Sequence, residues 1–575
     1  MLTDLAQIAP CAHAGCPLGV DVPAIAAALA VGDHERAHRL ARGANPFAST
    51  CGHACHAPCE SACRRRQHGA PVAAAMLEAF AADLAPPALL PDTGAVTSIF
   101  DARWTAALAA AGADGAAPVY PPARIAIVGG GAAGLACALV LSRLGHGCVV
   151  FDDGPEPGGV LTRAIPAFRI PLASVRAECA AILATGIELR RDAVRGRSAL
   201  RDLLGAGFDA VFLAAGAWRP REPLLGVLTS HAAEVIDAVD LLAGYHERRA
   251  HVVVVGDGDL AIDAARVAAR THAAGAPDAS VELVLTAPID GATVPTHALA
   301  AAMRDGVRLH AGWRPRRVVL SGETPGCVAA VEVSRDDGAA AQVLRCDQLV
   351  LAAPRAAAVH DVQADLALDG AGLVAVDPQT YQTSLHRVWA GGACAFGHRT
   401  IAHAIADGMR AGWQMHAALT GVAVPPSIAS ACVEAEDHIP ELARRAVTAP
   451  RRHLPLFDAP PADPFSSARH SATLATEEAA RCFDCTVLPS VDDECTGCGA
   501  CVAPCPTAAI ALGGMPRVAH IDPERCTRCG LCAEVCPEAA ITMVRAVWEL
   551  RPASGPSEAA VAPAAYGARA HLTGA

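Results

Sequence analysis

The hydrophobic positions in the middle of the chain alternate between short apolar runs and longer helical patterns. The run IAIV at residues 125–128 leads into a glycine-rich turn, a helical pattern and a second apolar run, CVVF at 148–151. The run VVVV at 252–255 begins a second unit of the same kind. Short apolar strands that alternate with helices predict an α/β domain with a parallel sheet. No apolar run is long enough to span a bilayer.

The turn after the first strand has the spacing of a dinucleotide-binding loop. Gly129, Gly131 and Gly134 form G-x-G-x-x-G. The first glycine permits a tight turn, the second lets the backbone approach a pyrophosphate, and the third allows close helix–strand packing. Asp152 ends the next strand, where an acidic residue would bind ribose. Isolated glycines are usually simple turns, but the surrounding strand, helix and acid favour the nucleotide site.

A second loop of this kind follows the valine run. Gly256 and Gly258 stand at its first two glycine positions, and Ala261 takes the third. Two dinucleotide folds in one chain predict two cofactors that exchange electrons. The alternative is a second fold that no longer binds a nucleotide.

Composition and charge exclude several other classes of protein. Of 575 residues, 53% are hydrophobic and 18% charged, which excludes a disordered chain. All 46 basic residues are arginine, so no lysine is present for a Schiff base or a phosphate loop. A net charge of −12 without basic clusters argues against nucleic-acid binding. The start, MLTDLAQIAP, lacks the features of a signal peptide, so we expect a cytoplasmic protein.

Cysteine is the most informative residue type. The 23 cysteines are clustered, which in a chain without an export signal indicates metal or redox centres. Two C-terminal runs have the spacing C-x2-C-x2-C-x3-C-P, and residues 491–545 resemble a two-cluster bacterial ferredoxin, in which each fourth cysteine ligates the other cluster. The predicted [4Fe–4S] ligand sets are Cys495, Cys498, Cys501 and Cys536, and Cys526, Cys529, Cys532 and Cys505. A pair of zinc sites is the alternative, although zinc favours two separated C-x2-C pairs.

A second group of cysteines lies near the N-terminus, with histidines among them. The group comprises Cys11, Cys16, Cys51, Cys55, Cys59 and Cys63, with His13, His53 and His56, so residue types alone leave a zinc site open. The surrounding sequence resembles the N-terminal iron–sulfur domain of the glutamate synthase small subunit, in the segments CPLGVDVPAIAAALAVGDHERAHRLARGANPF and CHAPCESACRRR. The same domain opens dihydropyrimidine dehydrogenase. This resemblance implies a helical domain with two [4Fe–4S] clusters.

The resemblance also implies how the N-terminal ligands are divided. Family members have a C-x2-C before the position of Cys11, whereas this chain has the pair far downstream in EEAARCFDC. The expected sets are Cys11, Cys63, Cys482 and Cys485, and Cys16, Cys55, Cys59 and Glu78, the last an oxygen donor aligned through Pro71 and LEAF. Cys51 is then left over as a non-ligand. The alternative for Cys482 and Cys485 is a loose redox pair in a linker.

The resemblance covers residues 11–420 and extends to the flavin site. PGGVLTRAIPAFRIP resembles the family segment along the flavin, FDAVFLAAGAW its strand-ending turn and RVWAGGACAFGHRTIAHAIADGMRAG its closing flavin motif. These segments add Gly159, Gly216 and Gly392 to the expected FAD site. The closing motif usually has an aspartate where this chain has Ala393, so we expect weaker retention of FAD.

The second fold should bind a nicotinamide nucleotide. Family members that use NADPH carry paired arginines that grip the 2′-phosphate, and this chain has Thr286 and Ala287 there. Their absence favours NAD(H), although arginines such as Arg266 and Arg270 could compensate.

Together these expectations define a multidomain α/β protein. The predicted parts are a helical iron–sulfur domain (1–80), a linker (81–121), an FAD-binding domain (122–220 and 365–420), a nested Rossmann-like NAD(P)-binding domain (221–364), a connector with C-x2-C (421–490), an α+β ferredoxin-like domain (491–545) and a tail (546–575).

The predicted function is electron transfer between NAD(P)H and a ferredoxin-type acceptor through FAD and a predicted four [4Fe–4S] clusters. The chain would be a subunit that serves a ferredoxin or a larger redox enzyme. Hydride passes directly between nicotinamide and flavin, so no catalytic side chain is nominated. One alternative is a glutamate synthase small subunit with a ferredoxin tail, which needs an amidotransferase partner. The other is a non-catalytic assembly subunit with decayed nucleotide sites.

Overall fold

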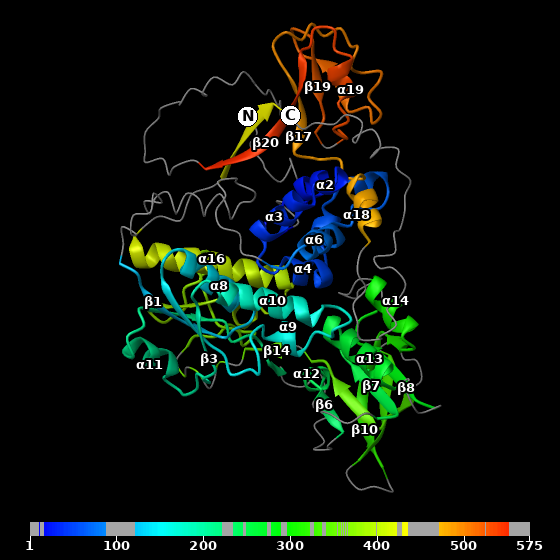
Figure 1. Cartoon of the computed structure of the whole chain (residues 1–575). Helices are drawn as coiled ribbons and strands as arrows, with labels where there is room; N and C mark the ends of the chain where they lie inside the picture. Colours follow the sequence, from blue (N-terminus) through cyan, green and yellow to red (C-terminus); the bar gives the residue numbers. More distant parts are fainter. Residues whose placement is uncertain are drawn as a thin grey trace.

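The computed structural model describes residues 11, 16–87, 121–220, 234–244, 249–272, 278–288, 296–321, 327–335, 341–421, 428–434 and 471–550, apart from single positions within 354–365 and at 398 and 524. The helices of the N-terminal domain lie between the two nucleotide-binding folds and the ferredoxin-like domain (Figure 1). Most of the expected linker and tail falls outside the described residues.

The first nucleotide-binding fold is a five-stranded parallel sheet. Its strands are β1 (Arg124–Val128), β2 (Gly147–Phe151), β3 (Glu188–Arg190), β4 (Ala210–Leu213) and β15 (Val388–Ala390), in the order β15-β4-β1-β2-β3. Ile125 and Ile127 of β1 face a core shared with α8 (Ala132–Arg143), α10 (Leu172–Leu183) and α16 (Ile401–Thr420). Ala126 and Val128 face the opposite side with α11 (Ala199–Gly205). Both faces of β1 are covered, which explains its unbroken apolar run.

The second nucleotide-binding fold is inserted between β4 and β15. Its parallel sheet has the order β6-β13-β7-β8-β9, formed by β6 (Val235–Asp237), β7 (His251–Val255), β8 (Ser280–Leu285), β9 (Arg308–Ala311) and β13 (Gln348–Leu351). The chain passes between the folds through β5 (Arg219–Pro220) and β14 (Arg355–Ala356), which pair antiparallel.

The two faces of the second sheet are covered by different elements. Val252 and Val254 pack with the helical layer of α12 (Ala238–Leu242), α13 (Asp259–His272) and α14 (Thr296–Arg304). Val253 and Val255 pack against the antiparallel sheet of β10 (Trp313–Leu320), β11 (Val328–Arg335) and β12 (Gln342–Arg345). The run of four valines therefore reflects burial on both faces.

The N-terminal domain is helical. It contains α2 (Val22–Ala30), α3 (His34–Ala44), α4 (Ala48–Ala54), α5 (Pro58–Ser61), the 3₁₀ helix η2 (Arg64–His68) and α6 (Ala74–Asp83). Asp21 and Asp33 cap α2 and α3 by accepting bonds from backbone N–H groups. Helices α4 and α6 touch at Gly52, where a Cβ would lie 2.4 Å from the Ala79 nitrogen.

The N-terminal domain is fixed to both of its neighbours. Glu178 of α10 is fully buried, accepts bonds from Ser49 N and Thr50 Oγ1, and pairs with Arg42. On the other side, α18 (Ala472–Ala479) packs against α2 and α6. Arg481 Nη2 then donates to Ala70 O at 2.7 Å, so the returning C-terminal segment lies against the N-terminal helices.

The ferredoxin-like domain contains β17 (Val487–Val491), β18 (Ile510–Gly513), β19 (Val518–Ile521), α19 (Leu531–Glu534) and β20 (Ile541–Leu550). Strand β20 pairs antiparallel with β17 and also with β16 (Ile428–Glu434). The segment 421–490, expected to be an extended connector, therefore contributes a strand of this sheet as well as α18. Strand β20 also carries the domain beyond residue 545.

Candidate functional site

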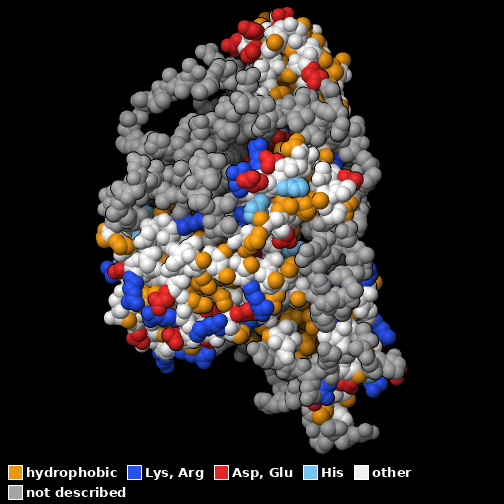
Figure 2. All heavy atoms as spheres, in the orientation of Figure 1, with side chains coloured by type: hydrophobic (Ala, Val, Ile, Leu, Met, Phe, Trp, Pro, Cys, Tyr) orange, Lys and Arg blue, Asp and Glu red, His pale blue; other side chains and the backbone are white. Residues whose placement is uncertain are grey.

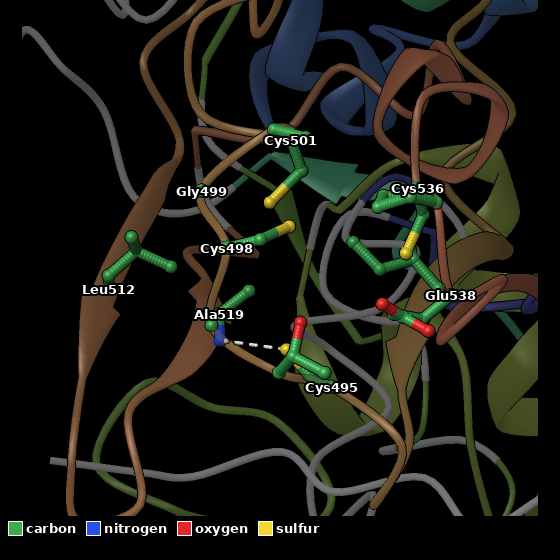
Figure 3. Close-up of a pocket in the computed structure, with 13 residues that line it drawn as sticks. Cys495, Cys498, Gly499, Cys501, Leu512, Ala519, Cys536 and Glu538 are labelled. Atoms are coloured by element: carbon green, nitrogen blue, oxygen red, sulfur yellow. Dashed lines mark hydrogen bonds between the residues drawn. The ribbon is translucent and has the colours of Figure 1, made fainter.

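Four cysteines of the ferredoxin-like domain surround one hollow. Cys495, Cys498 and Cys501 come from a single loop, and Cys536 comes from the turn after α19. Figure 3 shows their sulfur atoms turned toward a shared space, with Ala519 N donating to Cys495 Sγ at 3.5 Å. The empty volume is about 300 Å³, whereas one water molecule occupies about 30 Å³ in the liquid. The four thiols therefore share one open hollow at the surface of the ferredoxin-like domain.

The other four ferredoxin cysteines also lie together. Burial raises the pKa of Cys529, and the neighbouring thiols of Cys526 and Cys505 raise it further. Burial and the thiols of Cys526 and Cys529 raise the pKa of Cys532 to about 12. Backbone N–H groups point at two of the sulfurs, from Ala509 to Cys505 Sγ at 3.2 Å and from Arg528 to Cys526 Sγ at 3.4 Å. The structure therefore brings each fourth cysteine to the opposite run.

The N-terminal domain has a second hollow, completed by the C-terminal segment. Its lining includes Cys11, Cys63, Cys482 and Cys485, with an empty volume of about 410 Å³. Burial, then Cys485, Cys482 and Cys63, raise the pKa of the Cys11 thiol well above its usual value. Phe483 closes one side and lies under the Arg65 guanidinium at 5.1 Å. These four thiols are neighbours although about 470 residues separate them in the chain.

The remaining predicted N-terminal residues form a neighbouring set. Burial raises the pKa of Cys16 and Cys55, of the latter to about 12, and the Glu78 carboxyl raises both further. Cys59 is surrounded by Cys16, Cys55 and Glu78 and also lines the hollow of Cys11. Burial raises the pKa of Glu78 to about 7, against a hydrogen bond from Asn45 Nδ2 at 2.8 Å.

Cys51 and Glu60 lie in the same region. Cys51 is 1% exposed, and its thiol has both Glu78 and Cys55 as neighbours, so proximity alone does not separate it from the set. Burial raises the pKa of Glu60 to about 7, and Glu60 Oε1 accepts a bond from Ala75 N. Nothing in the sequence pattern drew attention to Glu60.

The donor types and their spacing fit clusters better than single ions. Within the part of the chain that the structure describes, no three His, Cys, Asp or Glu side chains lie close enough to hold one metal ion. A zinc ion with Zn–S bonds of about 2.3 Å draws its four sulfurs close together. Thiols that share a hollow without closing on one point suit a cubane of four irons, whose ligands bind different corners.

The first glycine-rich loop has the shape that a pyrophosphate requires. Gly129 has φ +106°, and a Cβ there would lie 2.3 Å from Ala214 O. A Cβ on Gly134 would lie 1.9 Å from Gly129 O, so only glycine allows α8 to begin so close to β1. Asp152 Oδ2 accepts from Gly130 N at 2.6 Å, which places the acid beside the loop. The residues present therefore fit a dinucleotide with its phosphates at the start of α8.

The other predicted flavin residues gather around this loop. Gly159 faces Gly131, whose Cα would lie 3.0 Å from an added Cβ, and Gly216 lies beside Trp218. Gly392 precedes α15 (Ala393–Phe396). Asp407 of α16 was not anticipated: it is 2% exposed and pairs with Arg399. Burial raises its pKa, while Arg399 and the N–H of Gly392 act against that rise, so an acid reaches the closing motif despite Ala393.

The second glycine-rich loop follows β7 in the same way. Gly256 has φ +142° with Ala352 O 2.3 Å from an added Cβ, Gly258 faces open space, and Ala261 is fully buried. Asp257 accepts bonds from Thr286 Oγ1 and from Ala287 N, the latter at 3.2 Å. A carboxylate thus occupies the position where NADPH-specific relatives would present arginines.

Arg266 and Arg270 are held elsewhere. Both lie on α13 and pair with Asp305, at 2.7 and 3.0 Å. Both guanidinium groups also stack over the Phe168 ring, at 4.3 and 4.1 Å. Their charge is already matched by a carboxylate and an aromatic face.

Comparisons with known proteins agree with this organisation. Residues 123–408 match the pyridine nucleotide-disulphide oxidoreductase family, residues 6–88 dihydropyrimidine dehydrogenase domain II with a 4Fe-4S cluster, and residues 494–540 the 4Fe-4S dicluster domain. The chain is 30% identical over 424 residues to the NADP(+)-dependent formate dehydrogenase subunit beta of Moorella thermoacetica. The aligned region covers 70% of this chain and 59% of that protein. It is 36% identical over 167 residues to the glutamate synthase (NADPH) small chain of Escherichia coli, and this region covers 26% of the present chain and 35% of that protein.

Among solved structures, the thioredoxin reductase of T. acidophilum covers 51% of this chain and 97% of its own, with 19% identity and a TM-score of 0.42. The chain spans little more than half the length of the formate dehydrogenase relative. The family matches confirm the expected resemblance and fold class, with a nucleotide-binding oxidoreductase fold between two kinds of 4Fe-4S domain. Within the described residues, no helix is both long and apolar enough to cross a membrane.

Proposed function

Residues 123–408 match the pyridine nucleotide-disulphide oxidoreductase family. From that match we propose that this chain is an NAD(H)-dependent iron–sulfur flavoprotein that moves electrons to or from a ferredoxin-type partner. One observation carries the proposal: thiol sets suited to clusters lie in the N-terminal domain, which packs against the flavin fold, and in the ferredoxin-like domain beyond it. Such a series suits electron transfer better than catalysis on a bound organic substrate.

The cluster assignment follows the four thiol sets. We infer clusters at Cys495, Cys498, Cys501 and Cys536, at Cys526, Cys529, Cys532 and Cys505, at Cys11, Cys63, Cys482 and Cys485, and at Cys16, Cys55, Cys59 and Glu78. The first and third sets each line one hollow, and Cys59, of the fourth set, borders the hollow of the third. A carboxylate as the fourth ligand of the last set is supported by the burial of Glu78 among those three cysteines.

The two nucleotide sites have different tasks. Bound FAD would accept two electrons as a hydride and release them one at a time. A nicotinamide and an iron–sulfur cluster need this conversion in order to exchange electrons. The loop of Gly129 and Gly131 would hold its phosphates, and Asp152, which lies beside this loop, would bind its ribose. The Asp257 carboxylate beside Thr286 disfavours a 2′-phosphate by repulsion, which supports NADH rather than NADPH as the donor.

The surface of the ferredoxin-like domain supports exchange with a partner. Cys498 is exposed, so the outermost cluster site lies close to solvent. Acidic side chains gather at this end of the molecule in Figure 2, and the exposed ones within two residues of a cysteine include Asp493, Glu494, Glu534 and Glu538. A partner with a basic rim around its own redox centre would be steered to this end.

Anaerobic titration with NADH and, separately, NADPH tests the proposed function. Flavin absorbance near the visible maximum and cluster absorbance are followed together as nucleotide is added. Bleaching of both by NADH, with a much weaker response to NADPH, is the expected result. Flavin that stays oxidised with either nucleotide, in protein that contains FAD and iron, would overturn the assignment of the second fold as the electron entry site.

A further inference from the structure

The ferredoxin-like domain and the N-terminal domain meet between two of the thiol sets. Arg64 follows Cys63, lines the hollow of Cys11, and donates from Nη1 to Pro523 O at 2.8 Å. Pro523 lies three residues before Cys526. The set of Cys11, Cys63, Cys482 and Cys485 is thus joined directly to the loop that carries Cys526, Cys529 and Cys532.

Arg528 lies in this junction. It stands between Cys526 and Cys529, and its side chain is only 1% exposed. Its Nη1 donates to Cys526 O at 3.0 Å. Its Nε and Nη2 are buried and have no hydrogen-bond partner among the described residues. No carboxylate in that part of the chain forms an ion pair with it.

A buried guanidinium without a carboxylate partner requires another anion nearby. Arginine keeps its charge in proteins, and burying an unpaired charge costs several kcal/mol. Arg528 lies near Cys485: burial raises the pKa of that thiol, and Arg528 acts most strongly against the rise. Arg64 acts in the same direction from the N-terminal side. Cysteine thiolates and cluster sulfides are the acceptors available to the two unpartnered N–H groups.

We propose that Arg528 is a positioning residue for electron transfer across this junction, with its buried cation and its two unpartnered N–H groups directed at the cluster held by Cys11, Cys63, Cys482 and Cys485. This inference rests on the proposed function. One electron leaves one cluster and enters the other, so one is oxidised and one reduced, and no bond forms or breaks. The fixed positive charge stabilises the extra negative charge of the reduced state, which raises the reduction potential of that cluster.

The test compares wild type with R528Q and with R525Q, using the full chain loaded with iron. Arg525 is exposed and lies on the same loop, so R525Q removes the same charge without removing the buried cation. Each protein is titrated with a reductant at set potentials, and reduced clusters are counted by electron paramagnetic resonance. We expect R528Q to lower the reduction potential of one cluster. At the potential where that cluster is half reduced in wild type, the ratio of reduced to oxidised cluster should fall about tenfold, which corresponds to a shift of about 59 mV for one electron. The ratio in R525Q should stay near wild type.

Unchanged potentials in R528Q, with full iron content, would overturn the proposal. An equal shift in R525Q would also overturn it, because the effect would then come from net charge and not from the buried position. If R528Q loses iron, R528K is used in its place, because lysine keeps the charge but not both N–H donors. We then expect a smaller decrease in the reduction potential of the same cluster. An unchanged potential would contradict the proposal.

Failure of the proposed function gives a different result. If C482S/C485S protein contains as much iron as wild type, the cluster that Arg528 is proposed to face does not exist, whatever R528Q does. If that iron is lost and R528Q has no effect, only the role of Arg528 is wrong.

Discussion

His56 Nε2 lies 2.7 Å from Asp259 Oδ2, and this contact joins the N-terminal cluster domain to the first turn of α13 in the second nucleotide fold. Arg169, from the flavin fold, completes the contact. Its Nη2 lies 3.2 Å from Asp259 Oδ2, and its Nη1 lies 2.6 Å from Asp263 Oδ2. Three domains therefore meet at one ionic group beside the second glycine-rich loop. This group ties the two nucleotide-binding folds to the N-terminal domain.

Loss of Arg169 should destabilise this meeting point. Burial raises the pKa of Asp263 to about 6 despite the nearby Arg169, so R169Q would leave a buried carboxylate without its partner. Breaking a buried pair in this way costs about 3 kcal/mol. We expect a clearly lower urea midpoint for R169Q and slower reduction of flavin by NADH.

Arg176 provides the matched control for this experiment. It pairs with Glu156 at 2.7 Å but is 57% exposed. An exposed pair contributes less than about 1 kcal/mol, so R176Q should unfold like wild type. Equal destabilisation by the two variants would show that Arg169 has no special place in the structure.

Removal of the downstream thiol pair should cost one cluster. In C482S/C485S protein we expect a loss of about four irons per chain, since one [4Fe–4S] cluster would lose two ligands. The C327S variant is the control, because Cys327 lies far from every thiol set, at the start of β11, and should retain full iron. Iron and acid-labile sulfide assays distinguish the two outcomes. Full iron in the double variant would favour the redox-pair interpretation.

Nucleotide preference should respond to charge at the end of β8. In T286R/A287R the two guanidinium groups can bind a 2′-phosphate, and they also neutralise Asp257. We expect KM for NADPH to fall at least about tenfold while kcat with NADH changes little, because each charged hydrogen bond contributes about 1.5–3 kcal/mol. Steady-state reduction of an artificial acceptor measures both. A KM for NADPH that stays unchanged would mean that the nucleotide binds with its ribose elsewhere.

Acid should weaken the flavin fold through a buried histidine pair. His146 Nε2 and His416 Nδ1 lie 2.9 Å apart, and burial, then His146, lowers the pKa of His416 to about 4. The unfolded chain binds this proton near pH 6.5, whereas the folded chain binds it only near pH 4. The free energy of unfolding should therefore fall as the pH drops from about 6.5 to about 4.

The variant H416Q isolates this contribution from any acid loss of iron. Urea midpoints at pH 7 and pH 5 are compared for both proteins, and wild type should lose more stability between the two. Equal losses would show that the histidine pair does not carry the pH dependence.

The success of the sequence-based predictions depended on how local each feature is. The loops of Gly129 and Gly256 need only a strand, a tight turn and a helix within a few residues, so their conformation follows from short motifs. The ferredoxin spacing is equally local within each run. By contrast, the meeting of Cys11 with Cys482 follows no local rule, and its prediction depended on a C-x2-C missing from the expected place.

Several contacts that the sequence did not indicate join residues that are distant in the chain. Arg169 with Asp259, Glu178 with Arg42, and Arg528 with Cys485 each link residues more than 40 positions apart. Arginine and acidic residues are common on surfaces, so the amino-acid sequence alone does not distinguish these buried residues from exposed ones. Strand β16 was missed for a similar reason, because its partner β20 lies more than 100 residues away.

The shared lining of the Cys11 hollow has a consequence for how the protein is made. A ribosome synthesises the N-terminal helices first, and Cys482 and Cys485 emerge more than 400 residues after Cys63. Until then Cys11 and Cys63 lack two of the thiols beside them. The domain that begins the chain is thus completed near the end of translation, and a message truncated before residue 482 would yield a product with an unfinished iron site.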